Sequence, residues 1–348
     1  MKFKPLDFTR LKTYSLSSRK SKVEASCSAK AVAPGISFAG FLDSLPEILG
    51  AKDLKAVARS IADAKRGGKT VILGMGAHVI KVGLTPVIID LMEKGVITAL
   101  AMNGACVVHD FEMAYQGKTS EDVDAEIGEG TFGMARETGG YINAAIVKGV
   151  GRGLGLGASV GKAIAEGFTP TKETVSGATG ERVSFKFPEK SLLAAAHRLN
   201  VPAMVHVAIG TDIIHMHPSC DGAATGEGSL RDFRAFCSVV ASMEGGVYIN
   251  LGSAIILPEA FLKAVTLARN LGSPLKEITT VNMDFIQSYR PNTNVVRRPT
   301  MKGGKGYSLT GHHEIMFPLL AAAVLEALTP PTQMTECPAS PERRGVKE

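Results

Sequence analysis

The chain has 348 residues, of which 45% are hydrophobic and 21% charged, so it is long enough for one large domain or two small ones. This composition excludes a disordered chain, a collagen and a small disulfide-stapled protein. The five cysteines are scattered and form no CxxC pair, which favours a reducing, cytoplasmic compartment. No run of about 18 apolar residues occurs, so we expect no membrane span.

The positive charge is concentrated at the start of the chain. Residues 1–22 carry seven basic side chains and one acidic one, which equals the whole net charge of +6. We predict a basic, mobile N-terminal arm over 1–37; its serine-rich, acid-poor composition also resembles a transit peptide. The remaining chain is neutral and has no tryptophan, so no nucleic-acid partner is expected.

The first half of the body predicts a parallel α/β unit. Apolar residues at helical spacing predict a helix over 38–66, followed by a buried strand over 70–74. A second helix is expected over 79–95 and a second strand over 97–102. This strand–helix–strand order is typical of a parallel sheet.

The middle of the chain is less regular. Residues 119–130 are acidic, with Thr119-Ser120 as a helix cap, and 169–188 form a polar excursion. The glycine pattern at 155–161 resembles a dinucleotide fingerprint, but its spacing is GxGxxxG and no strand precedes it. We interpret it as a tightly packed helix or loop, with a phosphate loop as the alternative.

The α/β alternation then resumes to the end of the body. Helices are predicted over 189–199, 229–243, 258–271 and 315–328, and strands over 203–209, 247–251 and 278–281. The fold class is therefore α/β, a doubly wound Rossmann-like parallel sheet with helical decoration. We expect one nucleotide-binding domain over 38–330 and a polar tail over 331–348.

Glycines and small polar residues follow most of the predicted strands. In an open parallel sheet, ligands bind outside the carboxyl ends of the strands, where glycine lets a diphosphate approach the backbone and Asp or Asn holds ribose hydroxyls. The candidate cofactor contacts at these ends are Gly74, His78, Asn103, Gly104, Gly252, Ser253, Asn282 and Asp284. Together they predict a nucleotide cofactor.

Histidines supply the other candidate chemistry. His215 and His217 alternate on a segment near Asp212, so they point either to an active-site loop or to a shared metal. His109-Asp110 begins a predicted helix over 110–116. His312 and His313 precede the last helix and serve as a cap, a subunit contact or a cofactor contact.

Residues 290–305 are expected to form a long, polar, basic loop. A lysine in a cleft forms a Schiff base when desolvation lowers its pKa, so Lys302 and Lys305 are catalytic candidates. Arg297 and Arg298 suit a substrate carboxylate. The alternative is a solvated basic loop, or one that binds an acidic partner.

The order of these motifs over about 69–328 resembles the deoxyhypusine synthase family. The similar segments include TVILGMGAHVIKVG, VPAMVHVAIGTDIIHM, NLGSAIILPEAF and HHEIMFPLLAA. The resemblance implies a Rossmann-like fold, NAD as cofactor, a homotetramer and chemistry on a polyamine.

The sequence departs from that family at its catalytic positions. The family's lysine falls on Pro299, its histidine base on Pro258, and the second carboxylate of its Thr-Asp segment on His217, so that only Asp212 remains. A polycation such as spermidine requires carboxylates, so true deoxyhypusine synthase activity is not expected.

A shorter stretch, Asn103-Gly104 to His109-Asp110-Phe111-Glu112, resembles the NAD-dependent ornithine cyclodeaminase domain of bacterial arginine-catabolic enzymes. We therefore expect an NAD-dependent enzyme that oxidises a small amine or amino acid to an imine, followed by transfer or deamination. Asp212 would hold the substrate ammonium with Asp110 nearby, and His109, His215 or His217 would act as base. The alternatives are a non-catalytic NAD-binding or ligand-binding homologue and a metal-dependent lyase or hydrolase that uses His215 and His217.

Overall fold

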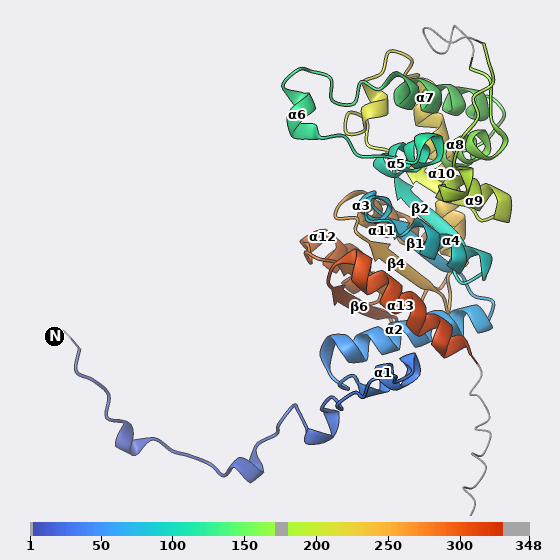
Figure 1. Cartoon of the computed structure of the whole chain (residues 1–348). Coiled ribbons are helices and arrows are strands. Elements are labelled where there is room, and N and C mark those ends of the chain that lie inside the picture. The colour runs from blue at the N-terminus through green and yellow to red at the C-terminus, as the bar shows by residue number, and fades with distance from the viewer. Residues whose placement is uncertain (1–2, 171–179, 330–348) are drawn as a thin grey trace, which may run out of the picture.

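The fold is built on a six-stranded parallel sheet. A computed structural model describes residues 3–170 and 180–329 (Figure 1). The strands are β1 (Val71–Met75), β2 (Ala99–Asn103), β3 (Ala203–His206), β4 (Val247–Leu251), β5 (Thr279–Asp284) and β6 (Lys305–Thr310). Their order is β3-β2-β1-β4-β5-β6, and every neighbouring pair is parallel. This is the doubly wound order, with the chain reversing direction across the sheet between β1 and β4.

Helices cover both faces of the sheet and also form a layer beyond the β3 edge (Figure 1). The helices are α1 (Phe38–Ser44), α2 (Leu49–Arg66), α3 (His78–Lys81), α4 (Thr85–Glu93), α5 (Gly104–Gln116), α6 (Val123–Ile127), α7 (Arg136–Val150), α8 (Leu156–Glu166), α9 (Leu192–Leu199), α10 (Gly222–Ala241), α11 (Ile256–Asn270), α12 (Tyr289–Pro291) and α13 (His313–Leu328).

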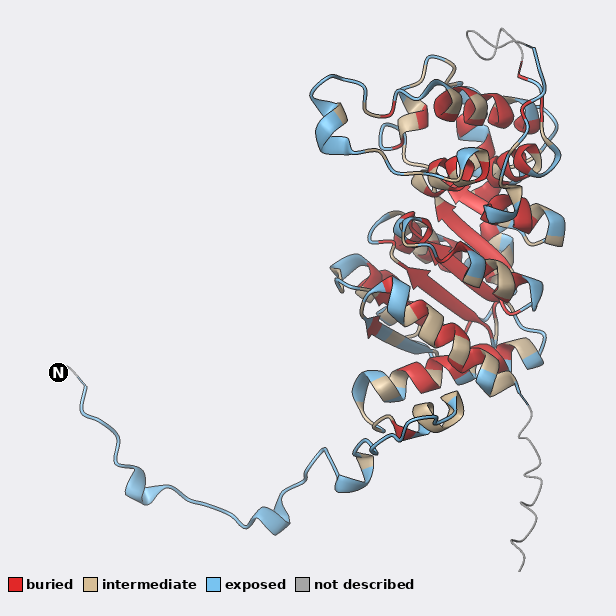
Figure 2. Cartoon of the chain, viewed as in Figure 1, coloured by how far each residue is buried: buried red, intermediate tan, exposed pale blue. Residues whose placement is uncertain are grey.

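The two faces of the sheet hold separate hydrophobic cores. Val71, Leu73 and Met75 of β1 pack into one core with α2 and α13, whereas Ile72 packs into the other with α10 and α11. Successive strand side chains point to opposite faces, so β1 must be apolar throughout to fill both cores. Figure 2 shows the inner strands buried between the helices, whereas the edge strand β6 is largely exposed.

Two predicted helices are each divided in the structure. The helix expected over 38–66 is interrupted between α1 and α2, where Pro46 follows Leu45 in an extended conformation. The helix expected over 79–95 is interrupted between α3 and α4, where Gly83 adopts a φ of 79°. Apolar periodicity continues across both breaks, so it did not reveal them.

The prediction of a long basic loop over 290–305 is wrong. This segment contains α12, a π-helix η6 (Asn292–Arg297), and the first residue of β6, the edge strand. Because β6 pairs on one side only and is largely exposed, it lacks the apolar alternation that identifies a strand.

The helix predicted from residue 110 begins earlier, at Gly104. The side chain of Asn103 caps α5 by accepting the backbone N–H of Cys106. In the acidic stretch, Asp122 and not Thr119-Ser120 caps the short helix α6. His109 and Asp110 therefore lie in the middle of a helix and face different surroundings.

The glycine-rich segment is a helix, as the sequence favoured. Gly155 precedes α8, which follows another helix and not a strand. A Cβ on Gly157 would lie 2.1 Å from the backbone oxygen of Ala203, and one on Gly155 would lie 1.8 Å from Asp232. Gly157 lets α8 pack directly against β3, and Gly155 lets the start of α8 approach Asp232 of α10, so close packing explains both glycines without a phosphate.

The N-terminal arm extends away from the body and is exposed over most of its described length (Figures 1 and 2). The first contacts with the body are backbone hydrogen bonds from Lys30 to Ser44 and from Glu47 to Cys27. Within residues 3–170 and 180–329, no helix is long and apolar enough to cross a bilayer. The predicted tail over 331–348 and part of the polar excursion over 169–188 lie outside the described residues.

Candidate functional site

A cavity of about 390 Å³ opens at the carboxyl ends of β1, β4 and β5. His78 enters it after β1, Gly252 after β4 and Asp284 from the last residue of β5, while His312 and His313 come from the start of α13. We name it the switch-point cavity, because it borders the β1–β4 junction where an open α/β sheet binds ligands.

The backbones of β1 and β4 approach closely beside this cavity. Gly76 donates its N–H to the carbonyl of Leu251, and a Cβ on Gly76 would lie 2.2 Å from the oxygen of Gly252. Gly252 has a φ of 65°, and its Cβ would lie 2.6 Å from the His313 ring. Any side chain at these two positions would fill the space where the strand ends meet.

The histidines of the cavity are arranged around one carboxylate. Nε2 of His313 lies 3.5 Å from Oδ1 of Asp284, and the rings of His78 and His313 meet edge to face at 5.5 Å. His313 is only 5% exposed, yet no residue within 3–170 and 180–329 forms a hydrogen bond with either of its ring nitrogens. A buried polar group without a partner is costly, so these nitrogens are suited to a ligand.

An amide ladder supports the walls of the cavity. Asn250 donates to the Ser253 carbonyl and to Oδ1 of Asn282, and Asn282 donates to Gln287. Gln287 in turn donates to the carbonyls of Asp284 and Leu309. Asn282 and Ser253, two predicted cofactor contacts, are therefore buried and hold the loops after β4 and β5.

A second cavity, of about 180 Å³, lies beyond the ends of β2 and β3. Its charged and titratable lining groups are Lys81, His109, Glu112, Glu121 and Asp212, and apolar residues such as Val108 and Phe132 complete the wall. We name it the helix-side cavity. It brings together Asp212 and His109, which lie 103 positions apart in the sequence.

Asp212 lies against the start of α5. A Cβ on Gly104 would lie 2.2 Å from Oδ2 of Asp212, so glycine is needed there for the carboxylate to approach the helix. Burial raises the pKa of Asp212, against smaller lowering effects from His215 and the backbone amides of Ala208 and Ala105. Oδ2 is buried, and no residue that the structure describes donates a hydrogen bond to it.

His109 is held by hydroxyl and carboxylate groups on the wall of the same cavity. Its Nδ1 lies 2.6 Å from Oγ1 of Thr119, which donates to Oε2 of Glu112 at 2.6 Å. Thr138 donates to the other oxygen of Glu112. Burial, with a smaller effect from Lys81, lowers the pKa of His109 to about 4.

Asp110 is fully buried and does not line either cavity. It accepts hydrogen bonds from the Ser191 hydroxyl and from the backbone N–H groups of Leu192 and Leu193, at the start of α9. Burial raises the pKa of Asp110 to about 6. Its position in the helix, one residue after His109, turns it toward the interior.

His215 and His217 do not face one shared site. Nδ1 of His215 accepts the N–H of Gly210, while His217 pairs with Ser219 and packs against Gly139 of α7. Within residues 3–170 and 180–329, no three His, Cys, Asp or Glu side chains are grouped to hold a metal ion.

The four basic candidates of 297–305 lie away from both cavities. Lys305 pairs with Thr279 at the amino end of β5, about 17 Å of strand from Asp284. Lys302 and Arg297 are exposed, and Arg298 donates to Asn294 within the same segment. Pro299 is buried and accepts from Arg269.

Sequence reasoning did not assign Lys81 or Thr119 to a site, and it noted Glu112 only as part of the His109-Asp110-Phe111-Glu112 stretch, without a role. Glu112 lies three residues after His109, the spacing that places two side chains on one face of a helix. That signal was present in the sequence. The contributions of Lys81 and Thr119 come from other segments, and only the folded chain shows them.

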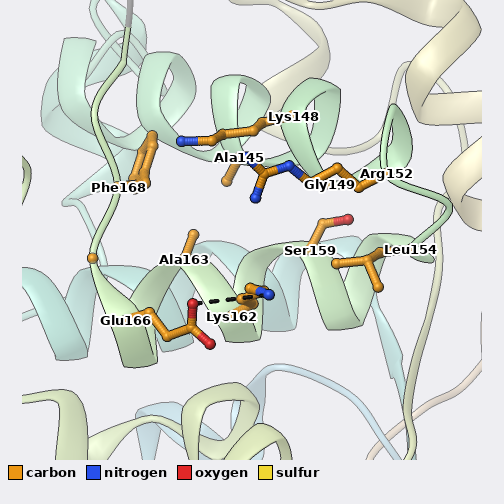
Figure 3. Close-up of a pocket in the computed structure, with 11 residues that line it drawn as sticks. Ala145, Lys148, Gly149, Arg152, Leu154, Ser159, Lys162, Ala163, Glu166 and Phe168 are labelled. Atoms are coloured by element: carbon orange, nitrogen blue, oxygen red, sulfur yellow. Dashed lines mark ion pairs between the residues drawn. The ribbon is translucent and has the colours of Figure 1, made fainter.

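A third hollow lies between α7 and α8, far from the strand ends (Figure 3). Lys148 and Arg152 border it from one side and Lys162 from the other, where Lys162 pairs with Glu166 at 3.9 Å. Its volume is about 60 Å³, too small for a nucleotide.

No protein-family model and no curated protein matches the chain. Among solved structures, it is similar to a candidate deoxyhypusine synthase from Entamoeba histolytica, with a TM-score of 0.48 and 12% identity over 84% of this chain and 94% of that one. It is also similar to AgrE in a ternary complex with ornithine and NAD+, with a TM-score of 0.46 and 16% identity over 80% of this chain and 34% of that one.

A third similar structure is a conserved candidate LOR/SDH protein from Methanococcus maripaludis, with a TM-score of 0.45 and 17% identity over 80% of this chain and 71% of that one. The chain thus spans about a third of the length of AgrE. At these scores and identities the similarities carry no functional argument.

Proposed function

We propose that this chain is an NAD-dependent enzyme that oxidises a small amine or amino acid to an imine, which an amine or water then attacks. The observation that carries the proposal is the switch-point cavity, lined from the ends of three strands beside the β1–β4 junction. Ligands of open α/β sheets bind at this place.

The residues of the switch-point cavity fit a dinucleotide. His78 and the one ring N–H of a neutral His313 offer donors to a diphosphate, and Asp284 offers an acceptor to ribose hydroxyls. Gly76 and Gly252 keep the strand ends free of side chains. When bound, NAD supplies the hydride acceptor.

The helix-side cavity is suited to the substrate. Asp212 on its wall offers a carboxylate to an ammonium group, and Lys81 offers an ammonium to a carboxylate. A cavity that offers both charges favours an amino acid over a simple amine. Arg297 and Arg298, the sequence candidates for the carboxylate, do not line this cavity.

Titration of the protein with NADH tests the cofactor assignment. An increase in the fluorescence emission of NADH reports binding. The chain has no tryptophan, so tryptophan emission does not contribute to the signal. His78 is exposed, and His78→Ala should weaken NADH binding about tenfold, since a hydrogen bond to a charged group contributes about 1.5–3 kcal/mol.

A matched variant controls for the loss of any histidine. His197 pairs with Glu166 and lines neither cavity, so His197→Ala should leave NADH binding unchanged. Equal losses in both variants, or no NADH binding by the wild-type protein, would contradict the cofactor assignment.

A non-catalytic ligand-binding protein is the second candidate. It is favoured by the positions of Lys302 and Lys305, neither of which lines the switch-point cavity or the helix-side cavity. Incubation of the protein with NAD and a panel of amines and amino acids separates the two candidates. Steady production of NADH from any of them supports the enzyme, whereas NADH binding without turnover supports the second candidate.

A further inference from the structure

A hydrogen-bonded chain runs from Glu112 through Thr119 to His109 on the wall of the helix-side cavity. The Thr119 hydroxyl donates its single proton to Oε2 of Glu112 at 2.6 Å. Thr119 therefore has only lone pairs to offer to Nδ1 of His109, 2.6 Å away. The pairing requires that Nδ1 carries the proton, which leaves Nε2 of a neutral ring unprotonated.

Two other histidines near this region, His215 and His217, have hydrogen bonds that favour the opposite tautomer. Nδ1 of His215 accepts the N–H of Gly210, and Nδ1 of His217 accepts the N–H of Ser219. In their neutral forms the proton then lies on Nε2. His109 is thus the one of these three rings whose Nε2 is an acceptor, and no described residue hydrogen-bonds to that atom.

The surroundings of His109 keep its ring neutral. Lys81 from α3 faces it, as do Glu112 on its own helix, Glu121 from the following loop and Asp212 from the loop after β3. Desolvation and the charge of Lys81 lower its pKa to about 4, so the ring accepts hydrogen bonds throughout the physiological pH range.

We propose that Glu112 and Thr119 are positioning residues that fix the tautomer of His109, so that its Nε2 and the carboxylate of Asp212, which lines the same cavity, together accept hydrogen bonds from the ammonium group of one ligand. The identification of that ligand as an amine rests on the proposed function. An alkylammonium has a pKa of about 10, roughly six units above that of the ring, so the proton stays on the ligand. His109 is in this arrangement a binding group and not the base.

The tautomer is tested by nitrogen-15 NMR of the full chain with labelled histidine. The chain has eight histidines, and His109→Asn identifies the His109 signals. We expect Nε2 to resonate as an unprotonated ring nitrogen in the wild-type protein. Thr119→Val removes the link to Glu112 and should mix the two tautomers.

Thr138→Val is the matched control. It removes the other hydroxyl that donates to Glu112, without contact to Nδ1 of His109, so the tautomer should persist. A protonated Nε2 in the wild-type protein, or equal effects of the two threonine variants, would overturn the proposal.

The ligand chemistry is tested with n-butylamine and its N,N,N-trimethyl counterpart. The primary ammonium should shift the Nε2 signal of His109, and the trimethyl compound should not, because it has no N–H to donate. In Thr119→Val, n-butylamine should bind about tenfold more weakly. Equal responses to the two compounds would refute the assignment, while failure of NADH to bind the same sample would refute only the cofactor proposal.

Discussion

Neighbouring residues in one helix perform different tasks in this protein. His109 faces the helix-side cavity, and Asp110 faces the interior, where it binds the first backbone amides of α9. Successive residues of an α-helix are separated by about 100°, so adjacent side chains cannot share a narrow site. The sequence motif His-Asp therefore does not describe one functional pair.

The buried carboxyl of Asp110 should make stability depend on pH. Its folded pKa of about 6 exceeds the ordinary value of about 3.9, so its contribution is complete below pH 4 and is lost as the pH rises through 6. Between pH 4 and pH 7.5, the wild-type protein should lose roughly 3 kcal/mol of its free energy of unfolding relative to the Asp110→Asn variant. Urea denaturation of both proteins at the two pH values measures this; a constant or rising difference would contradict it.

At the scale of elements, glycines determine how closely the helices approach the sheet. Gly157 places α8 directly on β3, whereas Gly226 lies on the exposed side of α10 with no atom near its missing Cβ. Both are helical, and the sequence alone does not distinguish them. The difference lies in what each glycine faces.

The two glycines should respond oppositely to alanine. Gly157→Ala forces a Cβ to within 2.1 Å of the Ala203 carbonyl and should lower the free energy of unfolding by about 1–3 kcal/mol. Gly226→Ala should raise it by about 0.5–1 kcal/mol, because alanine is the better helix former. Chemical denaturation of the two variants compares them directly, and a Gly157→Ala protein as stable as the wild type would show that α8 is not packed as described.

At the scale of the whole molecule, the charge and the core are in different places. The arm carries the whole net charge, while the described residues before Phe38 contribute no buried side chain. The body has two cores, one on each face of the sheet, and these account for its stability.

Removal of residues 1–23 should leave the midpoint of urea denaturation unchanged, because residues 3–23, the part of this segment that the structure describes, make no hydrogen bond to the body. The truncated protein should elute early from a cation exchanger, since its remaining chain is neutral. A lower midpoint after truncation would mean that the arm binds the body or a second copy of the chain.

The sequence by itself determined the alternation of helices and strands and hence the class of fold. Buried parallel strands must be apolar on both faces, and runs such as Val71–Met75 identify them without knowledge of their neighbours. It also identified the residues after strand ends, because the carboxyl ends of parallel strands meet at one edge of the sheet. His78 and Asp284 reach the same cavity for that reason.

Only the tertiary structure decided which of those residues face a cavity. Asn282 and Ser253 follow the same sequence rule as His78, yet they serve the amide ladder inside the protein. The approach of Asp212 to Gly104 joins segments that are distant in the sequence, and the link between His109, Thr119 and Glu112 depends on how the loop after α5 folds back onto that helix. Such contacts depend on how helices and loops pack over the sheet, and local sequence patterns do not encode that packing.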